Sequence, residues 1–476
     1  MMNTLVMKFG GTSVGSAEAI ERVATQVQLA RESWPQVVVV LSAMSGVTDS
    51  LLAGANGAAA GDENSLAETV AVVSEKHLQT IEGLLHSEAE RELTRERVRT
   101  HVHEFSALCH AVHVLGEASP RALDAISSLG ERIVVHLVAA RLREIDCAAG
   151  AVRASELVRT DAQFQAANPD MEATRVLTRD TLAPLLADGV VPVVTGFMGA
   201  TEDGAITTLG RGGSDYSAAI IAVALDADEV WICTDVNGVM TTDPRIAADA
   251  RTLRTIAYRE IAELASAGAK VVHPKAISPI MERGIRMWIR NTFNPDGPAT
   301  RVLADGETQN DGVRAVTVVK AQSLLALEGR GMLGVQGIAA RTFAVVARAD
   351  TSITLIAQTS SEQSICFAVP QVSAQRVIAE LEREFKHEFE WRHIDRVCAQ
   401  DDIVIVTVVG AGMRHTPGIA GKVFSALGDR GLNVVAIAQG SSECSISLVV
   451  AAADGDDSVR AIHDMIITRG QQEVAQ

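Results

Sequence analysis

The stretch Leu5-Val6-Met7-Lys8-Phe9-Gly10-Gly11-Thr12-Ser13 decides the fold expected for this chain. An apolar run passes into two glycines and then into the amphipathic segment 17–30, so the pattern predicts a strand, a tight turn and a helix. Glycines let backbone N–H groups approach an anion, a helix start adds about half a positive charge, and Lys8 adds a full one. The stretch therefore predicts a phosphate-binding turn, with an ordinary strand-to-helix turn as the alternative. It is no Walker P-loop, because the lysine precedes the glycines.

Length and composition bound the class of protein. With 476 residues the chain is too long for one hydrophobic core, so two to four domains are expected. Hydrophobic residues make up 47% of the chain and aromatic residues only 3%, which fits helices packed on parallel sheets. The net charge of -17 argues against nucleic acid as a partner. It also makes each lysine or arginine that stands in a motif more informative.

The cysteines and the N-terminus indicate the compartment. The six cysteines are scattered, without a C-x-x-C pair or a metal-ligand spacing, so we expect reduced thiols. The first residues lack a signal-peptide pattern, and no apolar stretch reaches about 18 residues. The sequence therefore predicts a cytoplasmic protein without a membrane partner. The histidines between 101 and 113 share no helical face, so no metal site is expected from them.

Further apolar runs are typical of strands buried on both faces of a parallel sheet. Polar or glycine residues follow them, and the runs are 37–43, 190–197 and 229–239, with 287–290 as the last strand. Residues 50–145 are helical in pattern, with a mobile loop expected at 53–64. In an open α/β sheet, ligands bind at the carboxyl ends of the strands. We therefore expect the polar residues that follow the strands to converge on one crevice.

The segment Gly210-Arg211-Gly212-Gly213-Ser214-Asp215 is the strongest signal after Lys8. A glycine-rich turn that contains an arginine and precedes an apolar helix at 218–225 predicts a second anion-binding turn. Two such turns, the cations Lys8, Arg211 and Lys270, and the carboxylates Asp215 and Asp235 exceed what phosphate binding alone requires. They suit phosphoryl transfer, in which positioning and charge stabilisation supply most of the rate.

Four motifs in this order resemble those of the amino acid kinase family, and within it the aspartokinases. The motifs are Lys8-Phe-Gly-Gly-Thr-Ser-Val, Thr-Leu-Gly-Arg211-Gly-Gly-Ser-Asp215-Tyr, Thr234-Asp235-Val-x-Gly-Val-x-Thr-Thr-Asp-Pro-Arg245 and Gly-Ala-Lys270-Val-x-His-Pro. The resemblance implies an α/β fold for residues 1–305, an open and mostly parallel sheet sandwiched by helices. It also implies the transfer of a phosphoryl group from ATP, with Mg²⁺, to the β-carboxylate of L-aspartate, which begins lysine, threonine and methionine biosynthesis.

The resemblance also implies roles for individual residues. Lys8 is expected to contact the transferring phosphoryl group, and Asp215 to organise Lys8 or the Mg-ATP end. The residues expected to bind L-aspartate are Thr48, Glu131, Arg211, Gly212, Gly213 and Ser214. Those expected to bind ATP are Lys8, Gly10, Gly11, Ser42, Thr234, Asp235, Met240, Arg245, Lys270 and Val271. The alternative for Ser42 and Thr48 is a loop or N-cap role, and for Glu131 a solvated helix position.

Met240 is a departure from the family pattern. Many relatives carry a tyrosine at this position of the nucleotide loop. A polarizable thioether can still cover the adenine side, but a hydrogen bond from a phenol is lost. The departure affects the expected ATP contact at residue 240 and no other.

The last third of the chain contains an internal repeat with a constant offset. The pattern Gly-Ile-Ala-x3-Phe at 337–343 recurs at 418–424, and Ile-Ala-Gln-x-Ser-Ser-Glu-x-Ser-Ile at 356–365 recurs at 437–446. Each copy predicts a ferredoxin-like βαββαβ unit. A purely structural duplication is the alternative, but it does not require the polar Gln-x-Ser-Ser-Glu pattern to recur.

The two copies resemble tandem ACT domains, the amino-acid-sensing modules attached to aspartokinases. Their expected limits are 320–397 and 398–476, and the expected effector-binding residues are Gln358, Gln439, Ile338 and Ile419. The repeated pattern most resembles that of threonine-sensitive aspartokinases fused to a homoserine dehydrogenase, a domain that we expect to be absent here. Threonine is the first expected feedback inhibitor and lysine the second. A homodimer or homotetramer built through the ACT strand edges is expected.

Two competing hypotheses remain from the sequence. The first is an amino acid kinase that acts on another substrate such as glutamate, against which the Arg211 and Arg245 motifs and the tandem ACT units weigh. The second is a catalytically inactive amino-acid sensor. Lys8, Asp215 and Asp235 are all intact, which argues against a chain released from catalysis.

Overall fold

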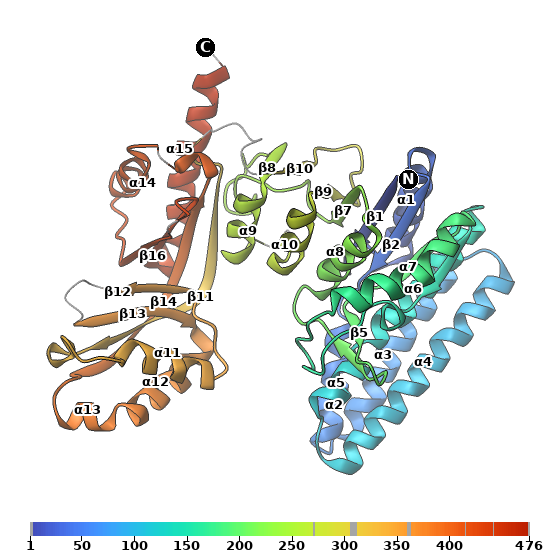
Figure 1. Ribbon diagram of the computed structural model, residues 1–476, viewed down its shortest axis with the longest axis horizontal. Coiled ribbons are helices and arrows are strands. Elements are labelled where there is room, and N and C mark those ends of the chain that lie inside the picture. Colours follow the sequence, from blue (N-terminus) through green and yellow to red (C-terminus); the bar gives the residue numbers. More distant parts are fainter. Residues whose placement is uncertain are drawn as a thin grey trace. The chain divides into compact units, whose positions relative to one another are not determined.

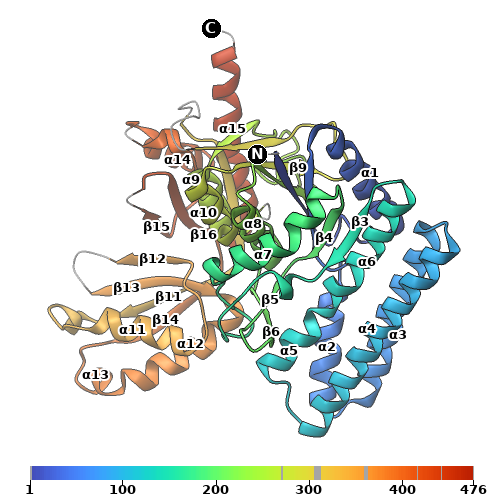
Figure 2. The same ribbon diagram turned by 45° about the vertical axis from the view of Figure 1, so that its right-hand side comes forward.

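The computed structural model describes residues 3–269, 272–304, 312–358, 363–414, 416–440 and 442–474. The chain divides into two compact units, whose elements are labelled in Figures 1 and 2. The first unit contains Met1–Val239, Thr252–Tyr258 and Lys270–Glu307, and the second contains Met240–Arg251, Arg259–Ala269 and Thr308–Gln476. The chain therefore enters the second unit three times, and it returns to the first unit after each of the first two entries.

An eight-stranded sheet forms the centre of the first unit. Its strand order is β3-β4-β2-β1-β7-β9-β10-β8, and all neighbours are parallel except β9 and β10. The strands are β1 (Thr4–Phe9), β2 (Gln36–Leu41), β3 (Ala149–Val152), β4 (Val191–Thr195), β7 (Glu229–Thr234), β8 (Thr255–Ala257), β9 (Arg286–Asn291) and β10 (Thr300–Leu303). A separate antiparallel pair joins β5 (Met198–Ala200) to β6 (Ile206–Thr208).

Helices cover both faces of this sheet, which confirms the predicted fold class. On one face, Leu5, Met7 and Phe9 share a core cluster with apolar residues of α1 (Ala17–Ser33) and α6 (Leu129–Glu144). On the other face, α7 (Met171–Ala187) and α8 (Gly213–Leu225) pack against each other and against β2. The other helices of this unit are α2 (Val47–Ala59), α3 (Glu63–Leu84), α4 (Glu88–Leu115), α5 (Pro120–Ser127), α10 (Pro274–Arg283) and the 3-10 helix η1 (Ala154–Glu156).

The mobile loop expected at residues 53–64 is wrong, because α2 continues to Ala59 and α3 begins at Glu63. The glycines that suggested a loop allow helices to approach closely. A Cβ at Gly54 would lie 2.7 Å from Thr69 Oγ1 and 2.9 Å from Phe105 Cζ. Figure 1 shows the result, in which α2, α3 and α4 run beside one another.

The sequence suggested that the strand around residues 287–290 is the last strand of the sheet. The structure shows that another strand follows it. After the Pro/Gly-rich segment the chain forms β10, which pairs antiparallel with β9 and parallel with β8. β10 is only four residues long and alternates between buried and half-buried positions. A pattern this short carries little periodicity, which explains why the sequence did not reveal it.

The second unit is built on a six-stranded antiparallel sheet with the order β12-β13-β11-β14-β16-β15. Its elements are β11 (Ala315–Glu328), η2 (Arg330–Met332), α11 (Ile338–Arg348), β12 (Leu355–Gln358), β13 (Ser364–Pro370), α12 (Gln371–Glu384), α13 (Lys386–Glu390), β14 (Arg396–Val409), η3 (Ala411–Met413), α14 (Ile419–Gly428), β15 (Ala436–Gln439), β16 (Ser445–Ala451), η4 (Ala452–Asp454) and α15 (Gly455–Val474). Most of α9 (Tyr258–Ser266) also belongs to this unit. Figure 2 shows α11 and α12 on one face of the sheet.

The internal repeat is visible in the elements themselves. The spacing between the starts of α11 and α14 is the same as that between β12 and β15, and between β13 and β16. Each copy contributes its own core cluster, one around Phe367 and Phe385 and one around Val406 and Leu448. The two ferredoxin-like units predicted from the repeat are therefore confirmed.

The two copies share their long strands. The second half of β11 packs in the cluster of the first copy through Leu325 and Leu327, whereas its first half packs in the cluster of the second copy through Val316. β14 is shared in the same way, with a register shift between the two halves of the β11–β14 pair. The second copy thus takes its fourth strand from a segment that precedes the first copy in the chain.

Two properties of the whole chain complete the description. All six cysteines are free thiols. None of the helices in the described ranges has the length and apolar character needed to cross a membrane.

Candidate active site

Lys8 and Asp215 form the centre of the candidate site. Lys8 lies near the carboxyl end of β1, Asp215 lies in the first turn of α8, and the Lys8 ammonium is 2.6 Å from Asp215 Oδ1. The two side chains are only 12% and 14% exposed, so water screens the pair weakly. Asp215 holds the Lys8 ammonium at the N-terminus of a helix, where backbone N–H groups also attract anions.

The glycine-rich turn before α8 allows the His273 ring to pack directly against its backbone. Gly212 has φ +72°, and a Cβ there would lie 2.1 Å from His273 Cγ, so no other residue fits. The backbone N–H of His273 in turn donates to Asp215 Oδ2 at 3.1 Å. Arg211, within the same turn, is exposed and makes no hydrogen bond or ion pair with the residues that the structure describes. Its guanidinium is therefore available to a ligand carboxylate.

Glu131 contributes a buried carboxyl group from the first turn of α6. The residue is 3% exposed, and its Oε1 accepts a hydrogen bond from the Ala43 N–H at 3.0 Å, while Oε2 finds no partner within the described residues. Burial raises the pKa of Glu131 to about 8, although the Ala43 N–H and the charge of Lys8 both oppose the rise. A buried acid with one unpaired oxygen near Lys8 is suited to bind an ammonium group.

The ends of β2 and β4 bring further predicted residues to the same region. The Ser42 N–H donates to the Phe9 carbonyl at 3.1 Å, which joins the end of β2 to the end of β1. A Cβ at Gly196, just after β4, would lie 2.8 Å from Ser214 Cβ. A Cβ at Gly130 would lie 3.3 Å from Val47 Cγ1, so the start of α6 packs on the start of α2, where Thr48 lies. The expected convergence at the carboxyl ends of the strands is therefore present.

The end of β7 lies next to the Gly10 turn. β1 and β7 are parallel neighbours, and the Gly10 N–H donates to the Cys233 carbonyl at 3.4 Å. Thr234 and Asp235 follow directly, and the Thr234 hydroxyl donates to Asp235 Oδ1 at 3.2 Å. Asp235 is exposed, which leaves its carboxylate accessible to a ligand or a hydrated cation.

Two of the predicted ATP residues belong to the second unit. Met240 is half-buried, and Arg245 is 85% exposed and bound to Asp243 through its guanidinium. The hydrogen bonds from Arg245 lower the pKa of Asp243. The predictions for Lys270 and Val271 lie outside the described residues.

The predicted effector residues occupy equivalent places in the two copies. Gln358 and Gln439 are exposed at the ends of β12 and β15. Ile338 and Ile419 are the first residues of α11 and α14, and they are only 4% and 5% exposed because each packs in the core of its copy. The roles assigned to the site residues of both units stay predictions.

Sequence reasoning missed a residue that braces the glycine-rich turn. Asp124 of α5 is 1% exposed and accepts hydrogen bonds from the Thr208 N–H at 2.9 Å, the Thr208 hydroxyl at 2.7 Å and the Gln165 N–H at 2.9 Å. Burial raises the pKa of Asp124 against these three donors. A single aspartate in an amphipathic helix gives no sequence signal for such a role.

Comparison with known proteins identifies the relatives of both units. Residues 3–291 match the model of the amino acid kinase family, and residues 325–385 and 406–466 each match an ACT domain model. The chain is 33% identical to a bifunctional aspartokinase/homoserine dehydrogenase of Haemophilus influenzae over 97% of its own length. It spans 56% of that protein, which is about half of a bifunctional relative.

A second relative matches along nearly its whole length. The chain is 32% identical to lysine-sensitive aspartokinase 3 of Escherichia coli, with 97% of this chain and 99% of that protein covered. A crystal structure of E. coli aspartokinase III in complex with aspartate and ADP superimposes with a TM-score of 0.81 at 30% identity, over 97% of this chain and 99% of that chain.

Proposed function

The chain belongs to the amino acid kinase family and carries two ACT domains, and from this premise we propose that it is an aspartate kinase. The reaction transfers the γ-phosphoryl group of ATP to the β-carboxylate of L-aspartate and forms ADP and 4-phospho-L-aspartate. One observation carries the proposal: the buried Glu131 carboxyl has an oxygen without a partner among the described residues and is close enough to Lys8 for the charge of Lys8 to act on its pKa. An ammonium site beside a phosphoryl site is what an amino acid kinase requires.

The proposed substrate contacts follow from charge. Arg211 pairs with the α-carboxylate, which its planar guanidinium can bind through two parallel hydrogen bonds. Glu131 pairs with the α-ammonium, and this contact compensates the cost of its burial. Thr48 and Ser214 supply hydroxyl groups at the ends of the elements that meet here. The ligands named for the E. coli relative, aspartate and ADP, support this assignment.

The proposed chemistry needs no general base. The nucleophile is the β-carboxylate of the substrate, which is already ionised at neutral pH. Lys8 stabilises the negative charge on the transferring group, and Asp215 fixes the position of its ammonium. The backbone N–H of Gly11, together with the N-terminus of α8, orients the phosphates, while the Gly10 N–H is used by the Cys233 carbonyl.

Mg²⁺ is part of the proposal as the companion of ATP. Magnesium is usually held by one or two carboxylates together with phosphate oxygens, and the exposed Asp235 carboxylate at the end of β7 offers such a ligand. When bound, the ion neutralises charge on the phosphates. Asp215 is engaged by Lys8 and therefore acts on the ammonium.

A coupled assay tests the function. Acyl phosphate formed from ATP is trapped with hydroxylamine, with aspartate and glutamate compared as acceptors. We expect activity with aspartate and its loss in Lys8→Ala, while Lys320→Ala, which removes an exposed lysine paired with Asp456, leaves it unchanged. Activity with glutamate alone would contradict the substrate assignment, and a folded wild type without activity would favour an amino-acid sensor.

We further propose that an end-product amino acid inhibits through the ACT domains. The Gln-x-Ser-Ser-Glu pattern favours threonine, whereas the name of the E. coli relative favours lysine. Each is added to the assay in turn. We expect Gln358→Ala or Gln439→Ala to relieve the inhibition, because both side chains are exposed at the ends of equivalent strands. Inhibition that persists in both variants would move the effector site elsewhere.

The edge strands support a homodimer or homotetramer built through the ACT domains. β12 and β15 are the two edges of the six-stranded sheet, and Ile356 and Ile437, at equivalent positions on them, are each 48% exposed. Exposed apolar edges favour pairing with another strand. Light scattering of the wild type and of Ile437→Lys tests this, and we expect a smaller assembly for the variant.

A further inference from the structure

The loop Met240–Arg251 begins six residues after the end of β7, yet it is part of the second unit. Its backbone is bound there at two points. The Val316 N–H of β11 donates to the Thr241 carbonyl at 2.9 Å, and Arg460 Nε of α15 donates to the Ile246 carbonyl at 3.0 Å. The Ile246 side chain also packs against the core cluster of the second ACT domain. This loop is therefore anchored to the second ACT domain.

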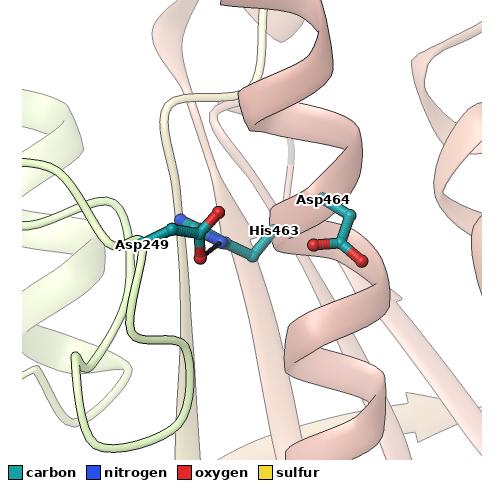
Figure 3. A group of neighbouring side chains, drawn as sticks. All are labelled: Asp249, His463 and Asp464. Atoms are coloured by element: carbon teal, nitrogen blue, oxygen red, sulfur yellow. Dashed lines mark ion pairs between the residues drawn. The ribbon is translucent and has the colours of Figure 1, made fainter.

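One imidazole joins the two ends of the loop to the last helix. His463 of α15 is fully buried, and its Nε2 lies 2.8 Å from Thr241 Oγ1. Its Nδ1 lies 3.4 Å from Asp249 Oδ1, the contact drawn in Figure 3. Thr241 Oγ1 also accepts a hydrogen bond from the Arg251 N–H at 3.0 Å. His463 thus contacts Thr241 near the start of the loop and Asp249 near its end, one turn of helix after Arg460.

The protons in this group can be assigned from the donors and acceptors. Burial lowers the pKa of His463, so the ring is neutral and carries one N–H. The Arg251 N–H uses a lone pair of the Thr241 oxygen, and the Thr241 hydroxyl can then donate to Nε2. The ring proton then lies on Nδ1, which makes no hydrogen bond within the described residues and lies 3.4 Å from Asp249 Oδ1. This assignment forms one chain of hydrogen-bonding groups from Arg251 through Thr241 to His463, and Asp249 adds a close contact to the ring.

The neighbouring Asp464 does not belong to this chain. Its carboxylate comes within 4.8 Å of the ligand atoms of Asp249 and His463, but it is paired with Arg430. Both aspartates are 56% exposed, and exposed carboxylates are common without a bound ion. We therefore interpret the contact between His463 and Asp249 as a tie between a helix and a loop.

We propose that His463 is a positioning residue for the nucleotide, because it fixes the loop that presents Met240 and Arg245. The inference rests on the proposed function, since the family resemblance assigns these two residues to ATP. A loop that is already ordered loses less conformational entropy when a ligand binds. Losing the tie should therefore weaken nucleotide binding and leave aspartate binding, through Glu131 and Arg211, unaffected.

Two pairs of variants in the full-length protein test the tie. Thr241→Val removes the hydroxyl at nearly constant shape, whereas Thr241→Ser keeps it. His463→Ala removes both ring contacts, whereas His463→Gln keeps an acceptor that can receive the Thr241 hydroxyl. Thr407→Val is the matched control, because Thr407 is a buried threonine of the same ACT domain whose hydroxyl meets Ser447 at 3.0 Å.

The readouts are the KM values for ATP and for aspartate, the affinity for Mg-ADP by calorimetry, and hydrogen exchange of the amides in 241–251. For Thr241→Val and His463→Ala we expect roughly tenfold weaker nucleotide binding, faster exchange and an unchanged KM for aspartate. Thr241→Ser and His463→Gln should recover most of the loss, and Thr407→Val should change none of these values.

The outcomes separate this inference from the proposed function. Equal changes in both KM values, or unaltered exchange in 241–251, would overturn the positioning role. A wild type that forms no acyl phosphate from aspartate would overturn the proposed function instead. Calorimetry and exchange would still decide the positioning role in that case, because neither depends on the acceptor.

Discussion

Glu131 shows how a single buried side chain trades stability for binding. Its carboxyl group is 3% exposed and has one partner among the described residues, the Ala43 N–H, and burial raises its pKa to about 8 from an ordinary value of 4.5. An acid whose pKa is raised by folding stabilises the folded protein through its protonated form. This contribution to stability is complete below the ordinary pKa of the acid and is lost as the pH rises through the pKa in the folded protein. In the substrate-free protein, ionisation of the buried Glu131 carboxyl therefore lowers the stability of the fold. The proposed contact with the substrate ammonium would offset this loss.

Glu131→Gln should stabilise the substrate-free protein at neutral and alkaline pH. Glutamine keeps the acceptor for the Ala43 N–H and cannot ionise, so we expect little change near pH 5 and a gain of about 3 kcal/mol at pH 7. Aspartate affinity should fall in the same variant, because a neutral amide pairs poorly with an ammonium. Thermal unfolding from pH 5 to pH 8, followed by substrate titration, measures both effects.

Glu104→Gln provides the control with the opposite sign. Burial raises the pKa of Glu104, but hydrogen bonds from His101 and Arg132 outweigh it and hold the value at about 2. Such a group stabilises the fold above its ordinary pKa, and this contribution is lost as the pH falls towards 2. Glu104→Gln should therefore lower the unfolding temperature at pH 8. A gain in both variants would show that the Glu131 effect is not ionisation.

Gly212→Ala should abolish the site, because its backbone conformation and its surroundings both exclude a side chain. The positive φ alone costs an alanine about 1 to 2 kcal/mol, and the added Cβ would also collide with His273. We expect roughly a hundredfold loss of kcat, since displacing the start of α8 moves Asp215 relative to Lys8 of β1. Gly204→Ala is the matched control, with φ +82° and nothing within 4 Å of its Cβ. It should lose stability and keep activity.

At the scale of elements, the glycines of α2 test whether packing outweighs helix propensity. In an exposed helix, alanine is favoured over glycine by about 1 kcal/mol. At Gly54 the Cβ would lie 2.7 Å from Thr69 Oγ1 and 2.9 Å from Phe105 Cζ, so Gly54→Ala should destabilise the first unit. In α14 a Cβ at Gly421 meets nothing within 4 Å, so Gly421→Ala should stabilise the second unit. Chemical denaturation that resolves the two transitions checks both signs.

The same glycines show why part of the fold could not be predicted. The sequence revealed the buried strands and the repeat, because apolar runs and motifs that recur at a constant spacing can be read directly along the chain. It assigned a loop to 53–64, because close packing between α2 and α3 leaves no local sign in a segment rich in Gly and Ala. β10, with only four residues, was missed for lack of periodicity. Both failures come from tertiary context, which outweighs local propensity.

The grouping of several candidate residues could be expected from the sequence, whereas their roles stay predictions. Lys8, Arg211 and Asp215 lie in motifs whose glycines mark the turns, so their convergence near the start of α8 could be expected. Asp124 and His463 could not be found this way, because each braces a loop far away in sequence and lies in an ordinary amphipathic helix. Residues in ligand-binding motifs can be recognised in the sequence, whereas residues that position those motifs often cannot.

At the scale of the whole molecule, segments that are consecutive in the sequence belong to different structural units. The motif that begins at Thr234 continues without interruption to Arg245, yet the chain passes from the first unit to the second between Val239 and Met240. The two ACT copies read as consecutive modules, yet they exchange the halves of β11 and β14. A boundary drawn at residue 320 therefore separates the second ACT domain from its own fourth strand.

The shared strand leads to a prediction about folding of the regulatory segment. A fragment 312–476 contains the first half of β11, which pairs with residues 405–409 of β14 and buries Val316 in the second cluster. A fragment 321–476 keeps both helices of each copy but leaves that edge of β14 unpaired, with Val404, Val406 and Val408 facing an incomplete core. We expect hydrogen exchange at 403–409 to be slow in the longer fragment and fast in the shorter one. Exchange in the first copy, around 365–369, should be slow in both, because the second half of β11 is present in each. Equal protection at 403–409 would mean that the second ACT domain completes its sheet without the segment that precedes the first.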